Sequence, residues 1–239
     1  RNATSCIIEG NEFGESVGVS PFEVQKVLVI NNVFQGAGYP IDCASVDELV
    51  VNDNVISQPD SAHISLFSDV PPHFEFTHNN VIGNIQFSIG VGSLNISCNN
   101  FRQLSKPLLV GDFPHENTLP SPYIFANNSF ESHGFEFHNP ADLRLLESAV
   151  FQNNSVQGVE IPVISGLVDE IIDCSEYPQV IAYNCTEVSF INAEFTQIGT
   201  ALSLFLCTEC QVPDLSAVNC SDAVHLYRCK ATLIDNLHV

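Results

Sequence analysis

Positive charge is scarce in this 239-residue chain, which has 7 Lys and Arg residues against 28 Asp and Glu and a formal net charge of −21. Binding to nucleic acids or to anionic membranes needs surface cations that neutralise phosphates, so the composition argues against both partners. A self-repelling surface keeps a repetitive β protein soluble, and it also suits an extracellular setting or a basic partner.

Methionine and tryptophan are absent, and no apolar run approaches the ~18 residues of a membrane-spanning helix. The longest apolar runs, such as ALSLFLC at 201–207, have the length of a β-strand. The sequence begins RNATSC, without Met and without a signal peptide. We therefore expect a mature or trimmed chain whose targeting segment has been removed.

Nine cysteines and six Asn-x-Ser/Thr sequons together favour the secretory pathway, where disulfides form and asparagine is glycosylated. The sequons begin at Asn2, Asn95, Asn127, Asn153, Asn184 and Asn219. Cys207 and Cys210 form a lone C-x-x-C, which indicates disulfide chemistry rather than a zinc site. We expect a secreted, extracellular glycoprotein without a metal or other cofactor.

An eight-residue phrase, h-x-h-x-x-N-x-h with h apolar, recurs along the chain. It occurs as CIIEGNEF (6–13), VLVINNVF (27–34), LVVNDNVI (49–56), LNISCNNF (94–101), YIFANNSF (123–130) and AVFQNNSV (149–156). Near matches are FEFTHNNVI (74–82), interpreted with one inserted residue, VSFINAEF (188–195) and ATLIDNLH (231–238). The h-x-h half predicts a strand with one buried face, and the asparagine predicts a corner, because Asn tolerates left-handed backbone.

Buried asparagine amides need hydrogen-bond partners, and stacking one asparagine per turn at the ~4.8 Å strand spacing would supply them. The phrase predicts an internal asparagine ladder of Asn11, Asn32, Asn54, Asn80, Asn100, Asn128 and Asn154. Consecutive members lie between 20 residues (Asn80 to Asn100) and 28 residues (Asn100 to Asn128) apart. Such variation is typical of a solenoid with fixed strands and insertions in its loops.

The same phrase is the core of a leucine-rich repeat, and VQKVLVINNVF at 24–34 fits that consensus fully. A second alternating segment follows most copies, for example HISLF (63–67) and IQFSI (85–89), often after Gly or Pro. Several strands per ~22-residue turn favour a β-helix. A leucine-rich horseshoe remains the alternative.

The pattern N-x-F…G-x-P-I-x-h…h-x-h-x-x-N resembles the parallel β-helix repeat of the pectin-lyase-like superfamily over roughly residues 5–239. The resemblance implies an all-β fold, a right-handed parallel β-helix of three sheets and about ten coils with side chains stacked inside. We expect one domain over 1–239, either whole or a fragment of a longer solenoid.

Enzymes of that superfamily degrade or epimerise acidic polysaccharides, and the polygalacturonases among them carry N-T-D, D-D, G-H-G and R-x-K. This chain offers only Ser132-His133-Gly134 and Arg228-Cys229-Lys230 as partial matches. It marks no pair of carboxylates for glycoside hydrolysis. Asp53 and the DE pairs at 47–48 and 169–170 are interpreted as solvated loop acids rather than calcium ligands, so no catalytic or metal-binding residue is assigned.

The late coils repeat every 22 residues, which places Cys185, Cys207 and Cys229 at equivalent positions of adjacent coils. A coil spacing of ~4.8 Å lies inside the Cα window of a disulfide, so Cys185–Cys207 or Cys207–Cys229 can form, and Cys210–Cys220 can close a neighbouring corner. A row of buried free thiols is the alternative. Because nine is odd, at least one cysteine is free or pairs with another chain.

Three functions remain open. The favoured one is a secreted, non-catalytic solenoid with a structural or recognition role, binding glycan or protein along its long face. The others are a polysaccharide-active lyase or hydrolase with a divergent site, and a segment of a larger cell-surface or matrix protein. Exposed aromatics would favour glycan binding, with Tyr39, Phe113 and Tyr177 as candidate contacts, whereas a tight carboxylate cluster would favour an enzyme.

Overall fold

The computed structural model describes residues 3–15, 18–36, 38–58, 61–68, 72–89, 92–106, 108–110, 123–137 and 149–239. These residues form strands and turns, with no helix among them. They build a parallel β-solenoid of about nine turns, which confirms the expected β-helix with slightly fewer coils. The leucine-rich horseshoe is thereby wrong, because each turn carries several strands.

The first part of the solenoid, residues 3–160, has three sheets. The seven-stranded sheet contains β1 (Ala3–Glu9), β3 (Val24–Ile30), β6 (Glu48–Asn52), β9 (His73–Thr77), β12 (Ser93–Ser97), β15 (Tyr123–Ala126) and β18 (Val150–Gln152). The eight-stranded sheet contains β2 (Glu12–Phe13), β4 (Val33–Gln35), β7 (Val55–Ser57), β10 (Asn80–Ile82), β13 (Asn100–Arg102), β16 (Ser129–Phe130), β19 (Ser155–Val156) and β20 (Val159–Glu160). The five-stranded sheet contains β5 (Ile41–Ala44), β8 (Ala62–Phe67), β11 (Ile85–Ile89), β14 (Leu108–Val110) and β17 (Phe135–Phe137).

The second part, residues 163–238, repeats the three-sided plan with other strands. One four-stranded sheet contains β21 (Val163–Ser165), β23 (Val180–Tyr183), β26 (Thr200–Phe205) and β29 (Asp222–Tyr227). The other contains β22 (Ile171–Asp173), β24 (Ser189–Ile191), β27 (Gln211–Val212) and β30 (Leu233–Ile234). The three-stranded sheet contains β25 (Ala193–Thr196), β28 (Leu215–Val218) and β31 (Leu237–His238).

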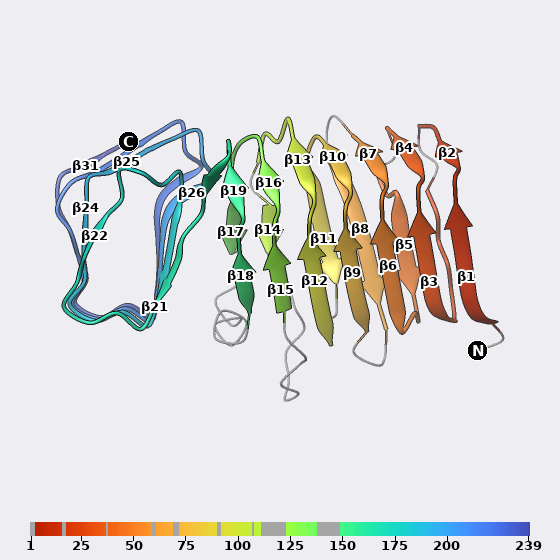
Figure 1. Ribbon diagram of the computed structural model, residues 1–239, viewed down its shortest axis with the longest axis horizontal. Coiled ribbons are helices and arrows are strands. Elements are labelled where there is room, and N and C mark those ends of the chain that lie inside the picture. Colours follow the sequence, from red (N-terminus) through yellow and green to blue (C-terminus); the bar gives the residue numbers. More distant parts are fainter. Residues whose placement is uncertain are drawn as a thin grey trace.

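The two parts run in different directions. In Figure 1 the first part is seen from the side, and the second part is seen almost end-on as a triangle. The front strands of the first part point up, the five-stranded sheet lies behind them, and each coil lies to the left of the one before, so the winding is right-handed. Between the parts, β19 and β20 form an antiparallel pair, whereas the other paired strands are parallel.

The sheet of β21, β23, β26 and β29 closes the end of the first part. Strand β26 is buried along its whole length. Ile181 and Phe205 belong to the core of the first part, while Leu202 and Leu204 belong to the core of the second. A sheet buried on both faces needs continuous apolar runs, which explains the stretch at 201–207.

Gln179 joins the two parts and is fully buried. Its Nε2 donates to the carbonyls of Phe135 at 2.6 Å and of Thr200 at 2.7 Å, and its Oε1 accepts from Phe135 N at 3.1 Å. The side-chain amide thus replaces a missing strand partner at the open end of the first part. Gly134 is needed beside it, because a Cβ there would meet the Gln179 Oε1 at 2.4 Å, and its φ is +58°.

The asparagine ladder exists in the first part. Asn32 Nδ2 donates to Asn54 Oδ1 at 3.2 Å, and the backbone N of Asn32 donates to the same oxygen at 2.9 Å. The contact recurs from coil to coil through Asn11, Asn32, Asn54, Asn79, Asn99, Asn128 and Asn154.

Two predicted ladder members, Asn80 and Asn100, are wrong. Asn79 and Asn99 hold these positions, each 1% exposed, whereas Asn80 and Asn100 begin β10 and β13 outside the ladder. Asn100 is exposed, and Asn80 is half-buried with an Oδ1 that has no hydrogen-bond partner among the described residues. The insertion assumed in 74–82 does not exist, since 74–81 fits the phrase directly with Asn79 as its asparagine. In 94–101 the same frame points to Asn99.

The corners explain why an inward asparagine can follow a strand. Most ladder residues come directly after a non-glycine residue with positive φ, for example Asn31 at 56° and His78 at 56°. Left-handed backbone at one residue turns the chain and points the next side chain into the core. Phenylalanines then stack across coils, as Phe101 and Phe130 do with ring centroids 4.9 Å apart.

A candidate binding face on the seven-stranded sheet

The outward side chains of the seven-stranded sheet form three rows that cross its strands, since every second residue points out. The first row is Ser5, Lys26, Glu48, His73 and Ser93. The middle row is Ile7, Leu28, Val50, Glu75, Asn95, Ile124 and Val150. The third row is Glu9, Ile30, Asn52, Thr77, Ser97, Ala126 and Gln152.

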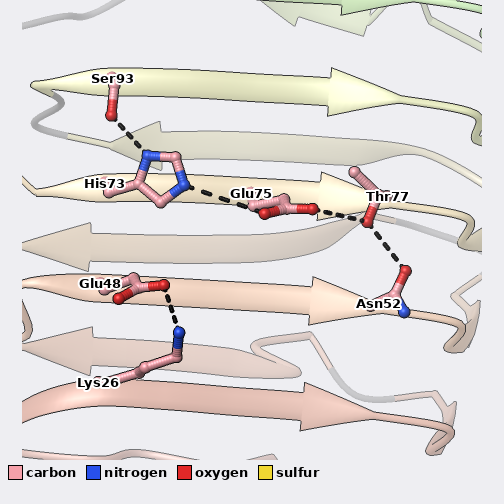
Figure 2. Close-up of polar contacts among 7 residues, drawn as sticks. All are labelled: Lys26, Glu48, Asn52, His73, Glu75, Thr77 and Ser93. Carbon is pink, nitrogen blue, oxygen red and sulfur yellow. Dashed lines mark hydrogen bonds and ion pairs between the residues drawn. The ribbon is translucent and has the colours of Figure 1, made fainter. Parts of the chain in front are cut away.

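The first row contains an ion pair. Lys26 Nζ lies 2.6 Å from Glu48 Oε1, with the two side chains 42% and 35% exposed (Figure 2). An ion pair at this exposure contributes ~0–1 kcal/mol to stability. Its main effect on the face is therefore to neutralise one lysine in a chain that has few cations.

A polar network links the three rows across β6, β9 and β12 (Figure 2). His73 Nδ1 lies 2.5 Å from Ser93 Oγ, and His73 Nε2 lies 4.0 Å from Glu75 Oε2. The Thr77 hydroxyl reaches Asn52 Oδ1 at 2.9 Å and Glu75 Oε1 at 3.3 Å, and its single proton serves one of them at a time.

Ser93, His73 and Glu75 have the residue types of a nucleophile, base and acid triad. The histidine-to-carboxylate distance of 4.0 Å is too long for a hydrogen bond. Acyl transfer also needs two amide donors for an oxyanion, but the N–H groups of Gly92 and Ser93 both donate to the carbonyl of Pro72, at 2.8 and 3.2 Å. The network is therefore a cross-strand polar surface that lacks the parts of an assembled hydrolase site.

The middle row is mainly aliphatic. Ile7 is 61% exposed and Val150 is 44% exposed at its two ends, with half-buried aliphatic residues between them. Glu75 and Asn95 interrupt it at the centre. Asn95 Oδ1 is buried and has no hydrogen-bond partner among the described residues, which costs ~1–3 kcal/mol. The three rows contain no Phe, Tyr or Trp.

The predicted glycosylation sites fall at two kinds of position. Asn95 lies in the middle row, whereas Asn127, Asn153, Asn184 and Asn219 are exposed corner residues with φ between 53° and 56°. Corners favour asparagine by themselves, although they do not require the Ser or Thr two residues later. Asn2 lies outside the described residues, and glycosylation stays a prediction.

All nine cysteines are free thiols in the structure. Cys185, Cys207 and Cys229 occupy matching corners of successive coils, and their predicted pairing stays a prediction. Cys210 and Cys220 belong to different corners: Cys210 Sγ donates to the carbonyls of Cys185 and Thr208, and Cys220 Sγ donates to that of Val218.

The remaining candidates from the sequence are scattered. Tyr39 is 63% exposed and stacks on His63 with centroids 5.1 Å apart, beside the five-stranded sheet. Tyr177 packs against the core of the second part, and Phe113 lies outside the described residues. His133 lies at the junction, where burial lowers its pKa.

Within the described ranges, no group of three or more His, Cys, Asp or Glu side chains is arranged to hold a metal ion. The same residues include no helix of a length and hydropathy that could cross a membrane.

Sequence analysis did not identify the outer face of the seven-stranded sheet. The residue between the two apolar residues of each h-x-h forms the middle row of that face, so the information was present in the sequence. Once the strands are aligned on the ladder, Leu28 and Val50 fall beside each other in the middle row. No sequence pattern marks Gln179, because its role depends on contacts with Phe135 and Thr200, which are distant in the sequence.

No protein-family model matches this sequence, and neither curated proteins nor solved structures include a detectable relative. The fold is therefore established by the geometry alone. The structure shows the parallel β-helix architecture expected from the sequence, and architecture alone carries no activity with it.

Proposed function

We propose that this chain is a secreted, non-catalytic recognition scaffold that binds an extended, basic segment of another protein on the outer face of its seven-stranded sheet. The observation that supports this most is the aliphatic middle row with a polar row on each side. Regular solenoid faces commonly act as extended binding surfaces. An extended segment lying across the strands would bury the aliphatic row and reach hydrogen-bonding groups on both sides.

The composition of the face favours a protein over a glycan as the partner. The three rows contain no aromatic side chain on which a sugar ring could stack, and the exposed Tyr39 lies beside the five-stranded sheet. The face carries Glu9 and Glu75 besides the paired Glu48, within a chain of net charge −21. Complementary positive charge on the partner would speed association and set its orientation.

Secretion and glycosylation belong to the same proposal. They are supported by the number of sequons and by the exposure of four of them at corners. A role as a segment of a larger cell-surface or matrix protein is compatible with this binding face. A hydrolase is the second candidate function, because Ser93, His73 and Glu75 have the residue types of a catalytic triad. The N–H groups of Gly92 and Ser93 argue against it, since both already donate to the carbonyl of Pro72.

A soluble peptide that alternates lysine and valine serves as the probe, with a peptide that alternates glutamate and valine as its counterpart. Fluorescence anisotropy should show binding of the lysine peptide, weakening as salt rises because exposed charges are screened. Val50→Thr, in the middle row, should weaken binding. The matched control Val55→Thr makes the same change on the outward face of β7 and should leave binding unchanged.

Equal effects of Val50→Thr and Val55→Thr on binding, whether a loss or none, would refute this binding face. Neither change alters charge, so nonspecific attraction of the peptide to an acidic protein would not distinguish the two valines. The polysaccharide-active alternative is tested by reducing-sugar and unsaturated-product assays on pectin, polygalacturonate, alginate and chitin fragments, with and without calcium. A hydrolase built on Ser93 is tested with the ester p-nitrophenyl acetate, since a Ser, His and Glu triad performs acyl transfer. We expect no turnover. Turnover that is lost in Ser93→Ala would overturn the non-catalytic function.

A further inference from the structure

The first coil of the second part, residues 163–177, leaves one end of the core open. Its inward apolar side chains are only half-buried, and they are Ile164, Leu167 and Ile172. Their neighbours on the next coil are fully buried, and they are Ala182, Cys185 and Phe190. The last strands, β29 and β30, lie at the opposite edges of the same sheets, so this opening is separate from the C-terminal end of the chain.

Leucine stands at the ladder position in this coil. Leu167 follows the left-handed corner residue Gly166, as most ladder asparagines of the first part follow their corners. The later coils of the second part have a cysteine at this position, namely Cys185, Cys207 and Cys229. The Leu167 side chain cannot hydrogen-bond, so only an apolar contact on its open side would remove it from water.

Strand β22 is the free edge of a parallel sheet in the same coil. The carbonyl of Glu170 and the N–H of Cys174 bond to β24, at 2.9 Å each. Because backbone groups alternate in direction along a strand, the N–H and C=O groups of Ile171 and Asp173 point away from β24. They make no backbone hydrogen bond to another described residue. Such a row of open donors and acceptors is a template for one more strand.

The edge is accessible from outside. In Figure 1, β22 lies on the side of the triangle farthest from the first part. Ile171 is 69% exposed, and Val168, at the corner before it, is 62% exposed. A strand added beside β22 would place every second side chain over Ile172 and the open core, and the side chains between them beside Ile171. Both contacts would bury apolar surface that is now in water.

The charge of this coil selects the occupant. Residues 159–177 contain no Lys or Arg but five acidic residues, which are Glu160, Asp169, Glu170, Asp173 and Glu176. A second copy of this chain would bring the same acids against them, because a two-fold interface presents the same patch from both sides. Like charges opposite each other on neighbouring strands are destabilising. A segment rich in Lys and Arg would instead be attracted to the edge.

We propose that β22 accepts an extended, basic segment of another protein as an added strand. Hydrogen bonds to the backbone of Ile171 and Asp173 hold the segment in place. Its apolar side chains cover Ile172 and Leu167, and its Lys and Arg side chains lie beside the acidic residues around β22. The proposal is independent of the binding face on the seven-stranded sheet, because that face binds through side chains across the strands and β22 binds through its backbone edge.

Amide signals in nuclear magnetic resonance spectra report on this site separately from the other face. The probe is the peptide that alternates lysine and valine. It should shift the Ile171 and Asp173 signals and slow hydrogen exchange at these two N–H groups by about tenfold or more, while the already bonded N–H of Cys174 changes little. Shifts confined to β3 and β6 would overturn this proposal and leave the seven-stranded face supported. Shifts confined to β22 would support this proposal and count against that face.

Two N-methylated forms of the peptide test for strand addition. In an extended segment the N–H groups of the lysines point to one side and those of the valines to the other. Methyl groups on one residue type therefore block pairing with β22, and methyl groups on the other type leave it open. Titrations followed at Ile171 and Asp173 should give affinities that differ by about tenfold or more. Equal affinities would overturn the proposal.

Two variants at one position separate the backbone from the side chain. Ile171→Pro removes the outward N–H without removing a bond to β24, and it should abolish the shift at Asp173. Ile171→Ala keeps the N–H and should retain most of the binding, so equal binding by the two variants would contradict the proposal. The methylated peptides decide the question on the unchanged chain even if Ile171→Pro fails to fold. A dimer of the unchanged chain in sedimentation velocity that Ile171→Pro dissociates would overturn the choice of partner, because a second copy would then occupy the edge.

Discussion

Replacing Asn99 by Leu tests the ladder register against its nearest competitor. Asn99 Oδ1 accepts from the backbone N of Asn79 at 2.9 Å and from its Nδ2 at 3.2 Å, and Asn99 Nδ2 donates to Phe76 O at 2.8 Å. Leucine removes all of these bonds from a site that is 1% exposed. Asn79 Nδ2 keeps the carbonyl of Val51, but the Asn79 N–H loses its acceptor.

The magnitude follows from this inventory. An orphaned buried N–H costs ~1–3 kcal/mol, and each further hydrogen bond lost costs ~1 kcal/mol. Asn99→Leu should therefore lower the free energy of unfolding by ~2–5 kcal/mol. Asn100→Leu makes the same chemical change one residue later on an exposed side chain, where the expected effect is within ~0.5 kcal/mol.

Urea unfolding followed by circular dichroism measures both variants, and an unchanged slope would show that the same structure unfolds. Equal losses of stability at the two positions, or a larger loss for Asn100→Leu, would refute the register and return the ladder to the frame first expected from the sequence. A loss for Asn99→Leu below ~1 kcal/mol would refute the energetic argument, because it would mean that water or a local shift satisfies the Asn79 N–H.

Three further predictions concern the junction, the effect of pH and glycosylation. Gln179→Leu should lower the free energy of unfolding by ~3 kcal/mol in urea, because the buried Phe135 N–H loses its acceptor and two carbonyls lose a donor. The control Gln211→Leu changes an exposed glutamine and should have little effect, so similar losses for the two variants would contradict the role of Gln179. Burial lowers the pKa of His133, so the unfolded chain binds more protons than the folded chain, and stability should fall as pH drops below the unfolded pKa of ~6.5. His133→Gln should reduce the slope of stability against pH in that range, and an unchanged slope would contradict the role of His133. Mass spectrometry of native material should show glycan on at least two of the six sequons, and the absence of any deglycosylation shift would contradict secretion.

The strands of the first part could be predicted because local and global requirements agree there. Val27 and Val29 alternate with half-buried residues, the next residues form a left-handed corner, and Asn32 turns inward. The strand, the corner and the inward asparagine all fall within the same eight residues, so the phrase h-x-h-x-x-N-x-h identifies most of the coils. The error at Asn80 and Asn100 arose where two asparagines are adjacent and both satisfy a loose pattern. Only the spacing from the preceding apolar pair decides between them, which is Phe74 and Phe76 in one coil and Leu94 and Ile96 in the next.

The change of direction at the junction could not be predicted, because it depends on contacts between distant segments. His133 pairs with Ile198, and Phe135 bonds to Gln179 across 44 residues of sequence. The apolar run at 201–207 was visible in the sequence, but an apolar run alone does not distinguish a strand buried on both faces from one buried on a single face. The candidate face was hidden for a similar reason, since its rows exist only when seven strands are placed side by side.

The exchange of asparagine for cysteine in the ladder separates two ways of holding a solenoid in register. An asparagine amide offers two donors and an oxygen acceptor, so each coil is bonded to the next whatever the loop length, and neighbouring ladder asparagines lie 20 to 29 residues apart. A thiol is a weak donor and a weak acceptor. The second part keeps a constant period of 22 residues instead, with Leu202 and Leu204 fully buried in its stacked core. Apolar stacking at a constant period fixes the register there, so the thiols are not required as structural hydrogen bonds.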